Sequence, residues 1–73
     1  MEYRILDKTG DTKVIFDKNV PEEVEAAEAQ FAALIEKGFK AFLVKKDGTP
    51  GRQIKTFNPT AERYIFVPAL VGG

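Results

Sequence analysis

The sequence predicts an α+β fold with the element order ββαβββ, in which one helix lies on one face of a mixed sheet. Two observations carry this prediction. The spacing of apolar residues changes along the chain from the short runs typical of strands to the three- and four-residue spacing of a helix, and then back again. Glycine, proline, asparagine and aspartate gather between these segments, where turns are expected.

The first two strands are expected at residues 3–6 and 13–16, because both segments are rich in residues that favour strands. Gly10 lies between them and can adopt the positive φ that a hairpin with a short or bulged loop requires. We therefore expect an opening β-hairpin. A shift of one residue would swap the two faces of a strand, so the sequence leaves open which side chains of the second strand point inward.

A helix is expected over residues 21–37, because apolar residues recur there at three- and four-residue intervals with glutamates between them. These apolar residues are Val24, Ala27, Phe31, Leu34 and Ile35. Their spacing places them on one side of the helix, so we expect that side to pack on the sheet. We assign the apolar side to the core and to no further function.

Both ends of the expected helix carry sequence signals. Asn19 is expected to cap the start of the helix together with Glu22, and Pro21 is tolerated in the first turn. Gly38 is expected to end the helix in a left-handed conformation, which would let Phe39 fold back onto the last turn.

Three strands are expected after the helix. "FKAFLVKK" (residues 39–46) has the apolar run of a strand inside a sheet, and "DGTPGR" (residues 47–52) must turn. "QIKTF" (residues 53–57) indicates a weaker strand, at an edge or with a bulge. "YIFVPAL" (residues 64–70) is the last expected strand, which Pro68 interrupts because proline cannot donate a hydrogen bond to the ladder.

Composition argues against several classes of function. The chain of 73 residues has no cysteine and no histidine, which removes thiol catalysis, the usual general base near neutral pH and the commonest metal ligand. So short a chain leaves little room for an enclosed active site, and we do not expect an enzyme. Eleven basic residues balance eleven acidic ones, so no net charge draws the chain to nucleic acid or to a membrane. We expect a cytoplasmic protein with protein partners.

The sequence finishes on "IFVPALVGG", and this ending is the candidate functional site. A C-terminal carboxylate becomes reactive when an enzyme adenylates it, and a narrow channel to the nucleotide admits only a slim, extended chain. Gly72 and Gly73 allow close backbone approach, and Pro68 stiffens the exit from the sheet. Small apolar contacts along this segment would come from Ala69, Leu70 and Val71. Gly73 would react through its carboxylate, and the protein itself would bind no cofactor, because the partner enzyme supplies ATP and magnesium.

The element order, the turn "KTGDT" at residues 8–12 and the final "VGG" together resemble the ubiquitin-like β-grasp family. The ending "FVPALVGG" is similar to the tails of small sulfur carrier proteins of the MoaD and ThiS kind. The resemblance implies one β-grasp domain over residues 1–73, with residues 68–73 as a flexible C-terminal tail. It also implies activation by an adenylating enzyme of the ubiquitin-activating or ThiF type, followed by transfer to target proteins or to a sulfur acceptor enzyme. "FNPTAER", before the last strand, is shorter than the matching segment of ubiquitin, so no residue of ubiquitin's binding surface is carried over.

Three alternatives stay open. The two glycines can be a frayed terminus, although only about 0.5% of chains would end in this pair by chance. The protein can be a β-grasp interaction module of a larger assembly, whose function would survive deletion of both glycines. It can also be a small nucleic-acid-binding domain, although we favour a solvated surface and no nucleic-acid partner. The basic residues that this last alternative would use are Lys40, Lys45, Lys46, Arg52 and Lys55. The sequence does not separate a modifier from a sulfur carrier.

Overall fold

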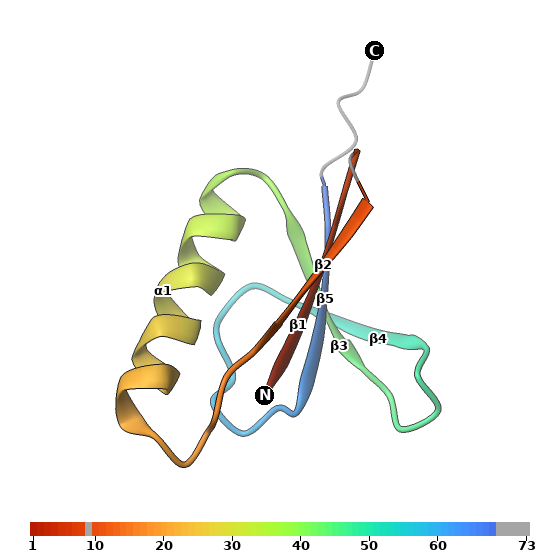
Figure 1. Cartoon of the computed structure of the whole chain (residues 1–73). Coiled ribbons are helices and arrows are strands. Elements are labelled where there is room, and N and C mark those ends of the chain that lie inside the picture. Colours follow the sequence, from red (N-terminus) through yellow and green to blue (C-terminus); the bar gives the residue numbers. More distant parts are fainter. Residues whose placement is uncertain (9, 69–73) are drawn as a thin grey trace.

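The structure is a computed structural model that describes residues 1–8 and 10–68. Its elements are β1 (Glu2–Asp7), β2 (Gly10–Ile15), α1 (Pro21–Glu36), β3 (Lys40–Val44), β4 (Pro50–Ile54) and β5 (Arg63–Val67). The five strands form one sheet, and α1 lies on one of its faces (Figure 1). The predicted α+β class and the ββαβββ order are therefore confirmed.

The strand order in the sheet is β2-β1-β5-β3-β4, so the last strand of the chain occupies the centre. β5 runs parallel to β1 on one side and antiparallel to β3 on the other. Both outer pairs, β1 with β2 and β3 with β4, are antiparallel and follow each other in the sequence. This topology is β-grasp-like.

The core fills the space between α1 and the sheet. Its buried members are Tyr3, Ile5, Phe16, Ala27, Phe31, Leu34, Ala41, Tyr64 and Phe66. The rings of Tyr3 and Phe66 lie with their centroids 4.8 Å apart, in a tilted arrangement. The hydroxyl group of Tyr3 donates a 2.6 Å hydrogen bond to the backbone carbonyl of Ala27, so its burial leaves no polar atom without a partner. The predicted apolar side of the helix therefore faces the sheet through Ala27, Phe31, Leu34 and Ile35, whereas Val24 is half-buried and is not among the residues packed on the core.

The expected cap at the start of the helix is wrong. Val20, not Asn19, is the N-cap residue, and it makes no side-chain capping hydrogen bond. The backbone N–H of Asn19 instead donates to the carboxylate of Asp17, while the backbone N–H of Asp17 donates to Glu23. Asp17 lies two residues before Asn19 and forms a local turn that fixes the entry of the chain into the helix. The prediction of the cap at Asn19 did not take the hydrogen bond from Asn19 to Asp17 into account.

Gly38 ends the helix as predicted, with φ at +99°. Its backbone N–H donates to Ile35 and that of Phe39 donates to Leu34, both at 3.0 Å, which is the Schellman arrangement of a helix end. The last helical residue is Glu36, one residue earlier than expected, because Lys37 forms the C-cap. Phe39 packs against the core, as the fold-back predicted.

Gly38→Ala is expected to lower the free energy of unfolding by about 1–2 kcal/mol, because a Cβ atom is disfavoured in the left-handed region. Gly38→Asn is the graded control, since asparagine tolerates this conformation better than alanine does. Urea unfolding of the three proteins measures the difference. Equal stability of the alanine variant and the wild type would contradict the left-handed end.

The remaining strands follow the predictions in kind and differ in their ends. β4 is an edge strand with a register shift in its pairing to β3, as its weak pattern indicated. It begins at Pro50, earlier than expected, because the first residue of an edge strand tolerates the missing N–H. The sequence left open which side chains of β2 point inward. The structure shows that Ile15 is 67% exposed, while Phe16, just beyond the strand, is buried. In the described part of the chain, no helix has the length and hydrophobicity needed to cross a membrane.

Candidate functional site

β5 leads directly to the predicted site and is held on both sides. Tyr64 and Phe66 are fully buried in the core. Pairing with β1 runs as far as Phe66, and pairing with β3 runs as far as Val67. Pro68 follows at once, exposed and outside the strand. The predicted interruption of the last strand at Pro68 is therefore confirmed.

Of the predicted site, the structure places Pro68. Ala69, Leu70, Val71, Gly72 and Gly73 lie outside the described residues, so the flexible tail predicted for residues 68–73 lies outside them except for Pro68. Pro68 follows β5 at the end of the sheet where the turn between β1 and β2 also lies, because β1 and β5 are parallel (Figure 1). A chain continuing from Pro68 thus starts from the central strand of the sheet.

Three side chains whose pKa values are shifted in the folded chain all lie away from Pro68. Burial is the main cause that raises the pKa of the Tyr3 hydroxyl group. Hydrogen bonds from Thr49 lower the pKa of Asp47, and a hydrogen bond from Lys18 lowers the pKa of Glu62. Each of these shifts moves the pKa away from neutral pH, so these three groups are not poised to exchange a proton at pH 7. Within residues 1–8 and 10–68, no group of three potential metal ligands is found.

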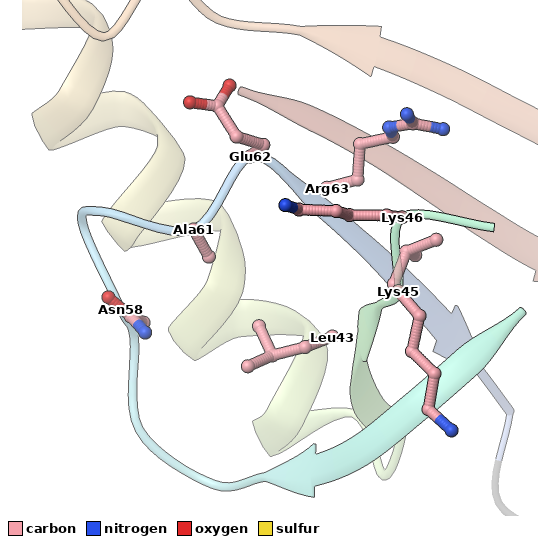
Figure 2. Close-up of a pocket in the computed structure, with 8 residues that line it drawn as sticks. Leu43, Lys45, Lys46, Asn58, Ala61, Glu62 and Arg63 are labelled. Carbon is pink, nitrogen blue, oxygen red and sulfur yellow. The ribbon is translucent and has the colours of Figure 1, made fainter. Parts of the chain in front are cut away.

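A hollow of about 320 Å³ lies at the opposite end of β5 from Pro68 (Figure 2). One wall comes from the end of β3 and the residues after it, and the other comes from the segment that leads into β5. Its lining residues are Leu43, Val44, Lys45, Lys46, Asn58, Ala61, Glu62 and Arg63. We call it the basic hollow, because three of these side chains are cationic and one is anionic.

The structure divides the basic residues that the sequence grouped together. Lys45 and Lys46 line the basic hollow, whereas Lys55 lines a second hollow of about 430 Å³ beside α1. Arg63 joins the two lysines because β3 and β5 pair, with Leu43 opposite Tyr64. Sequence reasoning did not single out Arg63 or Ala61, because they become neighbours of the lysines only through this long-range pairing. The available signal was the step from the apolar pair Leu43 and Val44 to the basic pair Lys45 and Lys46.

Comparison of the chain with protein-family models, with curated proteins and with solved structures gave no significant match. The description of the fold as β-grasp-like therefore rests on its topology: a mixed five-stranded sheet, a central β5 and a single helix between two hairpins in the described residues. A fold of this kind serves many functions, so the function has to be argued from particular sites.

Proposed function

We propose that this chain is a ubiquitin-like protein modifier or sulfur carrier that is activated at Gly73 by an ATP-dependent adenylating enzyme. The observation that carries the proposal is the continuity of "PALVGG" with β5, the central strand of a β-grasp-like sheet. The carboxylate of Gly73 is the reacting group, whether the chain is made with this end or a protease exposes it.

The position of β5 supports this proposal mechanically. A partner that draws the final residues into a channel pulls on the strand that leads to them. β5 is paired with two strands and carries two fully buried aromatic residues, Tyr64 and Phe66, so it can hold the domain in place while the tail is engaged. An edge strand would have hydrogen bonds to one neighbour only. The arrangement thus suits a globular anchor with a reactive end.

The dimensions of the proposed tail suit a narrow channel. Residues 69–73 can span at most about 17 Å when fully extended. Gly72 and Gly73 have no side chains, and the three residues before them are small or aliphatic. The carboxylate can therefore reach a nucleotide that lies deep in a partner while the folded sheet stays outside.

The proposed chemistry has two steps. A carboxylate oxygen of Gly73 attacks the α-phosphorus of ATP, pyrophosphate leaves, and an acyl-adenylate forms. A sulfur nucleophile or a lysine amine then displaces AMP. The partner enzyme binds the ATP and magnesium, and this chain contributes the carboxylate and the slim approach to it.

The product distinguishes a carrier from a modifier. A carrier should gain a thiocarboxylate, which replaces one oxygen of Gly73 with sulfur and is visible in the intact mass. A modifier should form an amide with a lysine of a target protein. Arg63 is the last basic residue of the sequence, so trypsin would leave residues 64–73 on that lysine as a diagnostic branch. Recovery of this branch or of the thiocarboxylate from cells decides between the two.

The competing function is an interaction module that needs no activated tail. A chain truncated after Val71 keeps every described residue and should keep the fold. Under our proposal this truncation removes all biological activity. Full activity of the truncated chain would replace our proposal with the interaction module.

A further inference from the structure

We propose that the basic hollow binds an acidic peptide segment of a partner protein, with an apolar side chain of the peptide on Leu43 and Ala61 and flanking carboxylates on Lys46 and Arg63. The hollow is at the other end of β5 from Pro68. The inference is therefore independent of the activation proposed for Gly73.

The floor of the basic hollow is apolar. Leu43, Val44 and Ala61 line it, and all three are half-buried. Figure 2 shows Leu43 and Ala61 on opposite sides of the space, from β3 and from the segment before β5. A volume of about 320 Å³ gives room for one large aliphatic or aromatic side chain with its neighbours outside. Binding of such a side chain to this floor is favourable, because it removes apolar surface from water.

The rim of the hollow is cationic, and its cations are spread out. Figure 2 shows the side chain of Lys46 across the mouth, with Arg63 and Lys45 pointing away in different directions. All three residues are exposed. Because the three groups point in different directions, they do not converge on one small anion (Figure 2). Acidic residues spaced along an extended peptide can reach separate cations, because each residue of a strand advances the chain by about 3.3 Å.

In the described part of the chain, the cations Lys45, Lys46 and Arg63 are not neutralised by an ion pair. After the hydrogen bond from Lys18, the charge of Arg63 contributes to lowering the pKa of its neighbour Glu62. Glu62 is the one carboxylate of the lining, and it forms its ion pair with Lys18. The like charges at the rim repel one another, and carboxylates of a ligand would relieve this repulsion. The net charge of the whole chain is zero, but the charges are unevenly distributed. α1 carries glutamates and no basic residue, so the hollow can be locally positive.

A second, smaller hollow extends the binding surface. It has a volume of about 120 Å³ and shares Val44 and Arg63 with the basic hollow. Its lining adds Ile65 and Arg4 on the sheet face that α1 does not cover. The lining also includes the carboxylate of Glu2, which forms an ion pair with Lys13. Arg63 lies between the two hollows, so an extended peptide in which apolar and acidic residues alternate can continue from one to the other.

Nucleic acid fits the basic hollow less well. Proteins that bind single strands stack the bases on aromatic side chains. None of the eight residues that line the basic hollow is aromatic. Its floor accepts an aliphatic group, which a phosphate backbone does not supply. An acidic peptide therefore matches both the apolar and the charged parts.

The test is a titration of the isotope-labelled full chain, followed by NMR, with a synthetic peptide that alternates acidic residues and leucine. The expected result is a change in the amide signals of residues 43–46 and 61–65, weakened by added salt. The Lys46→Gln, Arg63→Gln double variant should bind at least about tenfold more weakly, because two charge-assisted hydrogen bonds are lost. Lys37→Gln, at the far end of α1, is the matched control and should bind like the wild type.

Two control peptides and a nucleic acid complete the test. Replacing the acidic residues with their amides, or leucine with serine, should each abolish the signal changes. No change at residues 43–46 and 61–65 with millimolar acidic peptide would overturn the proposal. So would undiminished binding by the serine peptide, or tighter binding of a single-stranded oligonucleotide than of the acidic peptide. Both substituted side chains are exposed, so a melting curve like that of the wild type would show that the double variant is folded.

Discussion

Phe31→Ala is expected to lower the free energy of unfolding by about 3–5 kcal/mol. The Phe31 side chain is 3% exposed, and its ring contacts the rings of Phe57, Tyr64 and Phe66 at centroid distances of 5.9, 6.0 and 5.7 Å. Removing it leaves a cavity at the centre of the contact between α1 and the sheet. At roughly 0.05–0.15 kcal/mol per residue, a chain of 73 residues has a total stability of about 4–11 kcal/mol, so the substitution should remove a large share of it.

Ile15→Ala is the matched control for this prediction, because it also removes a large apolar side chain. Ile15 is 67% exposed on the edge strand β2, so its loss should change the stability by less than about 1 kcal/mol. Thermal or urea unfolding measures both variants. Equal effects of the two substitutions would show that α1 does not pack on the sheet through Phe31.

Gly72→Val is expected to abolish activation of Gly73 and to leave the fold unchanged. A branched side chain beside the reacting residue widens the chain and restricts its torsion angles, so the carboxylate should no longer reach the nucleotide. The measurement is exchange of pyrophosphate into ATP by the cognate adenylating enzyme. The expected signal of the variant is that of the enzyme alone.

Ala29→Val is the control for this second prediction, since it adds a branched side chain at an exposed position of α1. It should support exchange at the wild-type rate. A residue added after Gly73 should block exchange as Gly72→Val does, unless a protease removes it. Wild-type exchange by the Gly72→Val protein would mean that the last residues do not enter a narrow channel.

Most of the fold could be predicted because its signals are local. The helix follows from the spacing of Phe31, Leu34 and their neighbours. Its end follows from Gly38, because a glycine readily adopts the positive φ that this kind of helix end requires. The end of β5 follows from the missing N–H of Pro68. Each of these predictions depends on a few adjacent residues, and the structure confirms each of them.

The errors and omissions have non-local or competing causes. Asn19 was expected to cap α1, but its backbone N–H instead donates a hydrogen bond to Asp17 in a local turn. The exposure of Ile15 depends on the pairing of β2 with β1, which the pattern of one strand does not fix. The basic hollow needs Arg63 beside Lys46, and only the pairing of β3 with β5 brings them together. The predicted site beyond Pro68 stays a prediction, because it lies outside the described residues.

Trapping of an activated Gly73 tests the central claim most directly. The isotope-labelled chain is incubated with ATP and hydroxylamine in an extract of the cells that make it, and its intact mass and C-terminal peptide are then measured. Hydroxylamine displaces AMP or a thiol from an activated carboxyl group and leaves a hydroxamate. Our account predicts a hydroxamate on Gly73 that requires ATP and is absent from the Gly72→Val protein. An unmodified Gly73, in an extract that converts another carrier protein added as a positive control, would contradict it.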